Sequence, residues 1–188
     1  ERPFLNDSSI QTIQEGIGLG EISTQLAQDQ DLILFLGDTG AGKSTAINYL
    51  HGCTMVKNAQ LISVSSESSI PEIMPIGHER VSKTYIPQVF RSTTSGLSFC
   101  DCPGFNDNRG SDINIINSVN IKHILNAAQS VKLVLLINYQ FIESQRGRAV
   151  AELKKTISYL FGDSQSLEAF SDNIVIAITK APLSIEDE

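Results

Sequence analysis

The segment that most constrains this chain is the glycine-rich stretch at 37–45, which reads Gly-Asp-Thr-Gly-Ala-Gly-Lys-Ser-Thr. It fits the phosphate-binding pattern of Gly, four residues, Gly-Lys-Ser/Thr. The apolar run at 32–36 predicts a buried strand before it, and 44–50 predicts a helix after it that ends at Gly52. Because strand, glycine turn and helix are the context this pattern needs, a chance match in a glycine-rich loop is the weaker interpretation.

The residue types in this segment suit a phosphate chain and its metal ion. Glycines let the backbone bend so that N–H groups point at an anion, and a helix N-terminus adds partial positive charge. Lys43 would reach the β- and γ-phosphates, and the Ser44 hydroxyl would bind Mg²⁺. The candidate nucleotide-binding residues are therefore Gly37, Asp38, Thr39, Gly40, Ala41, Gly42, Lys43, Ser44 and Thr45.

A second motif, Asp101-Cys102-Pro103-Gly104, directly follows a predicted strand at 97–101. Asp-x-x-Gly alone is common in turns, and its position after an apolar strand gives it weight. Asp101 would hold Mg²⁺ opposite Ser44, and the Gly104 N–H would contact a γ-phosphate. Loss of that phosphate would release the loop, which is how a nucleotide-dependent switch works.

Apolar runs and helical patterns alternate through the rest of the chain. Buried strands are predicted at 132–139 and 173–179, a hairpin is predicted from 80–90 and 97–101, and helices are predicted at 111–129 and 148–161. This order predicts an α/β fold of the three-layer P-loop NTPase kind, with a mainly parallel sheet and helices on both faces. Ligands of such sheets bind beyond the strand C-termini, where both motifs fall.

The first 30 residues are predicted to be a helical extension to a nucleotide domain at 31–188. Helices are expected at 7–15 and 21–28, with the glycines at 16–20 as a loop between them. The extension would either pack beside the domain or form a dimer surface. The first residue is no natural start, and we expect the domain to lack its final strand and helix.

Composition narrows the classes of partner. The net charge of −7 (14 Lys and Arg against 21 Asp and Glu) argues against nucleic acid or an anionic membrane as the main partner. No apolar stretch reaches the roughly 18–20 residues of a transmembrane helix. The three cysteines, Cys53, Cys100 and Cys102, are too few and odd in number for a disulfide framework, which favours packing in the core and a reducing, cytoplasmic location. His51, His78 and His123 have no visible partner constellation in the sequence, and each is expected to be structural or exposed.

The two motifs together resemble those of GTPases of the translation-factor-related class. Within that class they are most similar to the septin-like group, which includes the immunity-associated (AIG1-type) and chloroplast-import receptor GTPases. Val81-Ser82-Lys83-Thr84 resembles the first switch of this group, which implies Thr84 as a ligand of Mg²⁺ and the γ-phosphate; an ordinary strand threonine is the alternative. Arg146-Gly147-Arg148 and the helix ending at Gly162 resemble the AIG1-type pattern.

The resemblance implies GTP and GDP with Mg²⁺ as ligands, slow hydrolysis, and a homodimer or oligomer formed through the nucleotide face. The chain departs from the family at the base-binding loop. The family pattern is Asn/Thr-Lys-x-Asp, and this chain has Thr179-Lys180-Ala181-Pro182. The Lys180 stem can lie along a purine ring, but Pro182 cannot accept hydrogen bonds from guanine.

A second departure is the absence of a glutamine after Gly104, where the chain reads Phe105-Asn106-Asp107. Slow intrinsic hydrolysis is therefore expected, with stimulation by a partner or by dimerisation. Candidate trans-acting or dimer-contact arginines are Arg109, Arg146 and Arg148, with surface positions lacking any role as the favoured alternative.

The leading hypothesis is a Mg²⁺-dependent GTPase switch. An ATP-using or base-tolerant P-loop NTPase is the first alternative, because Pro182 replaces the base-reading carboxylate. A catalytically inert pseudo-GTPase that serves as an interaction module is the second, and Lys43, Ser44 and Asp101 argue against it.

Overall fold

The computed structural model describes residues 7–58, 61–76, 86–104, 110–144, 158, 168 and 170–182. In chain order the elements are α1 (Asp7–Leu19), α2 (Glu21–Ala27), β1 (Asp31–Gly37), α3 (Lys43–His51), β2 (Met55–Asn58), β3 (Leu61–Val64), β4 (Gln88–Arg91), β5 (Ser98–Asp101), α4 (Ser111–Ala127), β6 (Ser130–Asn138), α5 (Tyr139–Ser144), the 3₁₀ turn η1 (Ser171–Asn173) and β7 (Ile174–Thr179).

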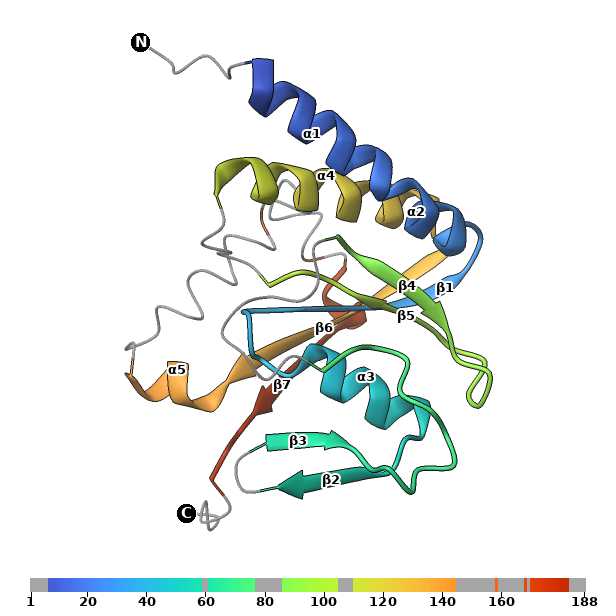
Figure 1. The fold of residues 1–188 in the computed structure, drawn as a ribbon, viewed down its shortest axis with the longest axis vertical. Coiled ribbons are helices and arrows are strands. Elements are labelled where there is room, and N and C mark those ends of the chain that lie inside the picture. The colour runs from blue at the N-terminus through green and yellow to red at the C-terminus, as the bar shows by residue number, and fades with distance from the viewer. Residues whose placement is uncertain are drawn as a thin grey trace.

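Five strands form a sheet in the order β4-β5-β1-β6-β7, in which only β4 is antiparallel to its neighbour. The chain leaves β1 through α3 and reaches β5 on one side, and it then passes through α4 to β6 on the other side. Right-handed crossovers in opposite directions place α3 and α4 on opposite faces of the sheet (Figure 1). The C-terminal end of β1 is therefore a topological switch point, where open α/β sheets bind ligands.

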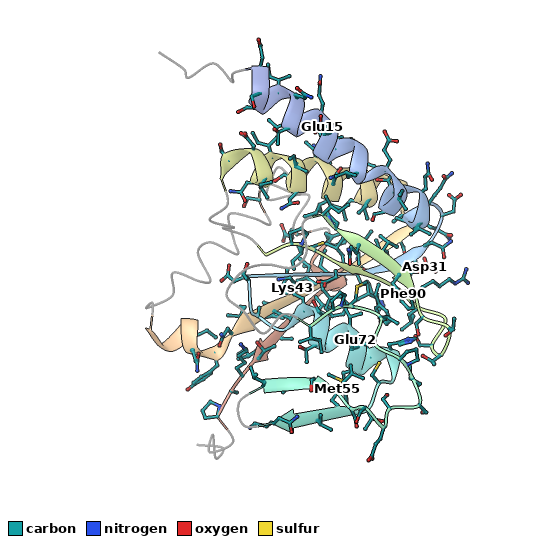
Figure 2. All side chains as sticks on the ribbon, in the orientation of Figure 1. Glu15, Asp31, Lys43, Met55, Glu72 and Phe90 are labelled. Atoms are coloured by element: carbon teal, nitrogen blue, oxygen red, sulfur yellow. The ribbon has the colours of Figure 1, made fainter. Side chains whose placement is uncertain are left out.

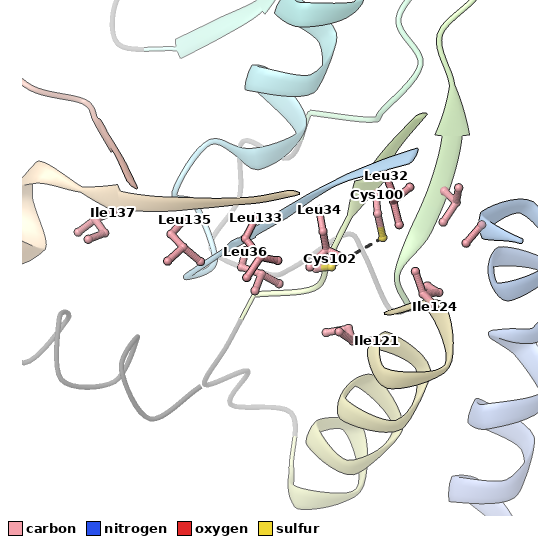
Figure 3. Packing of buried hydrophobic residues seen from close by; sticks show 12 residues of the cluster. Leu32, Leu34, Leu36, Cys100, Cys102, Ile121, Ile124, Leu133, Leu135 and Ile137 are labelled. Atoms are coloured by element: carbon pink, nitrogen blue, oxygen red, sulfur yellow. Dashed lines mark hydrogen bonds between the residues drawn. The ribbon is translucent and has the colours of Figure 1, made fainter. Parts of the chain in front are cut away.

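The sheet separates two apolar clusters. On the α4 side, alternate residues of β1 and β6 pack against Ile121 and Ile124 of the helix (Figure 3). The opposite side holds Phe35, Ala41, Ile47, Met74, Phe99 and Leu136, among which Phe35 and Phe99 meet edge to face. Both faces of β1 are buried, as its continuous apolar run predicts, and this fixes the strand that leads into the glycine-rich turn. The predicted α/β fold with a mainly parallel sheet and helices on both faces is confirmed.

The cysteines pack in the core as expected. All three are buried and free, and the Sγ atoms of Cys100 and Cys102 lie 3.8 Å apart in the α4-side cluster. None of the helices in the described part of the chain has the length and apolarity needed to cross a bilayer.

The predicted loop at 16–20 is wrong. Helix α1 runs through Leu19, and only Gly20 separates it from α2, with helical φ and ψ of −78° and −12°. A Cβ at Gly16 would lie 2.5 Å from Ile116 Cδ1, and one at Gly20 would lie 2.2 Å from Asn120 Oδ1. The glycines are therefore where α1 and α2 approach α4 closely, and the N-terminal extension packs on this helix (Figure 1).

Other boundaries differ in smaller ways. The predicted hairpin exists as β4 and β5, and β2 and β3 form a separate antiparallel pair. Strand β7 is present at the predicted place, but the predicted burial is wrong, because Val175, Ile176 and Ile178 are more than half exposed. The predicted helix at 148–161 falls almost wholly outside the described residues.

Helix α3 is tied to the following segment by the fully buried side chain of Asn48. Its Oδ1 accepts hydrogen bonds from the backbone N–H groups of Ile73 and Met74, at 2.9 and 3.2 Å, and its Nδ2 donates to the Met74 carbonyl at 2.7 Å. Gly52 ends the helix in the left-handed conformation, with φ of 104°. Asn48 thus satisfies three backbone groups that would otherwise be buried without partners.

We expect Asn48→Ala to lower the free energy of unfolding by about 3 kcal/mol, because buried backbone groups left without partners cost about 1–3 kcal/mol each. Urea denaturation of the variant and the parent measures the difference. The neighbouring Tyr49→Ala is the control, because this side chain is 68% exposed and its loss should have little effect. Equal losses in the two variants would contradict the anchoring role of Asn48.

Candidate functional site

The glycine-rich turn connects the end of β1 to the start of α3. Gly37 and Gly42 have φ of 151° and 94°, and a Cβ on Gly37 would lie 2.3 Å from the Leu136 carbonyl oxygen. In the described part of the chain, the N–H groups of Thr39, Gly40 and Gly42 donate no hydrogen bond. Together with the N-terminus of α3, these donors are the groups that the motif predicts for an anion-binding concavity.

Lys43 is the charged group of this concavity and is only 8% exposed (Figure 2). Its Nζ donates hydrogen bonds to the carbonyl oxygens of Gly37 and Asp38, at 2.9 and 3.0 Å. Burial lowers the pKa of Lys43, while the nearby negative charges, chiefly that of Asp101, oppose this shift. The ammonium group is thus held at the turn by two carbonyls, within reach of an anion bound there.

Ser44 and Asp101 join the two motifs directly. The Ser44 hydroxyl donates to Asp101 Oδ2 at 2.6 Å, and Asp101 Oδ1 is buried without a hydrogen-bond partner among the described residues. Asp101 is 2% exposed and lies beside Phe35 in the parallel pairing of β1 and β5. Burial raises the pKa of Asp101, and the Ser44 hydrogen bond and the Lys43 charge partly offset this rise.

These oxygens fit a magnesium ion. Mg²⁺ prefers hard oxygen ligands and is usually bound by one or two protein groups, while waters and substrate phosphates complete the octahedron. The unpartnered Asp101 Oδ1 and the Ser44 hydroxyl supply such ligands next to the concavity. No group of three or more His, Cys, Asp or Glu side chains in the described ranges could hold a metal by itself.

Gly104 brings the second motif against the first. A Cβ at this residue would lie 2.3 Å from Thr39 Oγ1 and 2.5 Å from Thr39 N. Only a glycine lets the backbone after β5 approach the glycine-rich turn this closely. Pattern matching found both motifs, and the fold places them in contact.

The end of β7 also reaches the turn. Thr179 donates through its hydroxyl to the Ala41 carbonyl at 2.8 Å, and Lys180 follows with a left-handed φ of 57° and an exposed side chain. The sequence marked Thr179 and Lys180 through family resemblance, and it did not indicate the bond to Ala41. Asn138, buried at the end of β6 and paired with Thr179, was missed because nothing in the sequence distinguishes it from the end of an apolar run.

The remaining candidates differ in their placement. Thr45 is half-buried in the first turn of α3 and makes no side-chain hydrogen bond in the described part of the chain. Thr84, Arg109, Arg146 and Arg148 lie outside the described residues. Lys43, Ser44, Asp101, Gly104 and Thr179 converge at the C-terminal edge of the sheet. They lie on an α/β fold in which a strand, a glycine-rich turn and a helix carry the P-loop sequence pattern.

Comparison with known proteins adds distant likenesses only. No family model matches the chain, and no curated protein matches it by sequence. Solved structures of Toc33 from Arabidopsis thaliana are similar: the complex with Mg²⁺ and GMPPNP has 17% identity and a TM-score of 0.37, with 93% of this chain and 80% of that chain covered.

The complex of Toc33 with GDP and Mg²⁺ has 15% identity and a TM-score of 0.37, covering 97% and 83% of the two chains. A dimerization-deficient mutant has 14% identity and a TM-score of 0.38, covering 96% and 82%. These TM-scores mark a remote likeness in overall shape, so the site is defined by this chain's own residues.

The raised pKa of Asp101 predicts the sign of a stability change. Folding favours the protonated form of this carboxyl. Its contribution to the free energy of unfolding is therefore present below the unfolded-state pKa and is lost as the pH rises through the folded-state pKa. At neutral pH without metal, Asp101→Asn should therefore raise the free energy of unfolding. The difference should narrow towards about pH 4, near the ordinary carboxyl pKa.

Urea denaturation in EDTA at both pH values tests this expectation. Asp172→Asn, at an exposed position, is the control and should leave the pH dependence unchanged. A destabilised Asp101→Asn protein at neutral pH would show that the carboxylate stabilises the metal-free fold.

Proposed function

We propose that this chain is a Mg²⁺-dependent guanine-nucleotide-binding GTPase switch. The observation that carries the proposal is the 2.6 Å contact of Ser44 with Asp101, beside the buried Lys43 and with Asp101 Oδ1 unpartnered among the described residues. A hydroxyl from the phosphate-binding turn and a carboxylate from a second strand converge there on one point. This is the ligand geometry that P-loop nucleotide chemistry requires.

Each residue has a defined role in the proposed reaction. The N–H groups of Thr39, Gly40 and Gly42 would hold the phosphate oxygens, and Lys43 would neutralise charge on the β- and γ-phosphates. Ser44 and Asp101 would hold Mg²⁺, and the ion would supply positive charge against the charge that develops on the phosphates. The Gly104 N–H would contact the γ-phosphate from the opposite side, and we include Thr84 as a further Mg²⁺ ligand on the resemblance of 81–84 to a first switch.

Guanine as the base, slow hydrolysis and dimerisation are proposed on the motif resemblance. The Thr179 bond to Ala41 supports a base site beside Lys180, because it fixes the end of β7 against the phosphate-binding turn. The absence of a glutamine after Gly104 supports slow hydrolysis stimulated in trans, with Arg109, Arg146 and Arg148 as candidate arginines from a second copy. We also propose a reducing, cytoplasmic location from the cysteine content.

We expect Lys43→Ala to weaken GTP binding by about 3 kcal/mol, roughly a hundredfold, because the variant loses a charge-assisted contact with the phosphates. Titration of the nucleotide-stripped protein with a fluorescent GTP analogue in Mg²⁺ measures the affinity. Lys57→Ala, at an exposed lysine, is the matched control and should bind as the parent does. Unchanged affinity in Lys43→Ala would remove this residue from the phosphate site.

Competition between GTP and ATP for the same site tests the identity of the base. We expect GTP to compete better, with a smaller preference than a base-reading carboxylate provides, because Pro182 accepts no hydrogen bond from guanine. Tighter binding of ATP would favour the ATP-using alternative. Turnover of phosphate that disappears in Lys43→Ala would exclude the inert pseudo-GTPase.

A further inference from the structure

We propose that His51, Ser92 and Thr94 form a positioning clamp that sets the distance between Ser44 and Asp101. The clamp lies at the C-terminal end of α3, away from the phosphate-binding turn, and touches neither nucleotide nor metal. It rests on the proposed function, because its effect is on the Mg²⁺ site assigned there.

The clamp is a buried hydrogen-bonded cluster. His51 is 3% exposed and Ser92 is 1% exposed, and His51 Nδ1 lies 2.9 Å from Ser92 Oγ. Thr94 Oγ1 lies 2.9 Å from Ser92 Oγ and 3.4 Å from His51 Nδ1. Ser92 Oγ also accepts the Ser95 N–H at 3.1 Å, so the cluster is built into the turn between β4 and β5. His51 is therefore structural, as one of the two expected outcomes has it, and the sequence did not indicate its partners Ser92 and Thr94.

Backbone and ring contacts reinforce this attachment. The Thr94 hydroxyl donates to the His51 carbonyl, one of the last carbonyls of α3, which have no partner within the helix. The imidazole ring meets the ring of Phe90 edge to face, with centroids 5.3 Å apart. The end of α3 is thus bound to the β4–β5 hairpin through a side chain, the backbone and an aromatic contact.

The same two elements meet again at the nucleotide site. Helix α3 begins with Lys43 and Ser44 and ends with His51, while the hairpin turn precedes β5 and Asp101 ends it. Each end of α3 is therefore hydrogen-bonded to one end of the β4–β5 hairpin. In Figure 2, Lys43 and Phe90 lie towards opposite ends of this arrangement.

Two attachments fix both the tilt and the translation of a helix against a strand, whereas one attachment leaves a pivot. Mg²⁺ needs ligand oxygens at about 2.0–2.1 Å in near-octahedral geometry, so a small displacement of Ser44 from Asp101 weakens the site. A buried polar cluster suits this task, because hydrogen bonds fix direction and distance more sharply than apolar packing does. The clamp would thus act as residues behind other metal sites do, by holding the ligand side chains in position.

The test compares two substitutions of the same residue. His51→Phe keeps an aromatic ring against Phe90 and removes the hydrogen bonds, while His51→Asn retains a polar atom near the position of Nδ1. Two quantities are to be measured for each variant. One is the GTP affinity in EDTA, and the other is the Mg²⁺ concentration that produces half of the maximal increase in GTP affinity. His51→Phe should raise that concentration about tenfold, as loss of a supporting residue does at other metal sites, with affinity in EDTA unchanged. His51→Asn should restore most of the Mg²⁺ response.

The controls separate the clamp from the function on which it rests. His123→Phe, at an exposed histidine of α4, should behave as the parent. An unchanged Mg²⁺ response in His51→Phe, or equal losses with and without Mg²⁺, would overturn the clamp alone. A parent protein whose GTP affinity does not respond to Mg²⁺ would overturn the proposed function. If His51→Phe does not fold, Thr94→Val replaces it and is held to the same outcomes.

Discussion

The hydrogen bond between Ser44 and Asp101 is the contact on which the site depends. It joins the start of α3 to the end of β5. It depends on the parallel pairing of β5 with β1, because that register places Asp101 beside Phe35, near the turn that leads into α3. Burial around this contact is costly, because it disfavours the charged forms of both Asp101 and the adjacent Lys43, and the Ser44 hydrogen bond offsets only part of that cost. Such local departures from stability are typical of sites shaped for a ligand.

The surrounding fold offsets this cost with two apolar clusters and several satisfied polar anchors. Helix α3 is the central element, because it carries Lys43 and Ser44 in its first turn, Asn48 in its middle and His51 in its last turn. Each of these residues is hydrogen-bonded to a different neighbouring segment. The helix therefore transmits the geometry of the sheet to the nucleotide site.

Sequence reasoning succeeded where the signal is local and failed where a distant partner decides. The apolar runs predicted β1, β6 and the place of β7, because strand formation follows from neighbouring residues. The glycines at 16–20 were predicted as a loop, since each glycine costs about 1 kcal/mol in a helix. In the structure this segment is helical instead, and Gly16 and Gly20 pack closely against Ile116 and Asn120 of α4. That contact is not visible in the sequence.

The sequence by itself determined the glycine-rich turn, the strand and helix on either side of it, and the α/β class, because these depend on contiguous residues and on periodicity. Only the tertiary structure decided which side chains meet. Ser44 and Asp101 are 57 positions apart, His51 and Ser92 are 41 apart, and Thr179 and Ala41 are 138 apart. These pairings follow from strand order and from the crossover of α3, and no local pattern encodes which strand lies beside which.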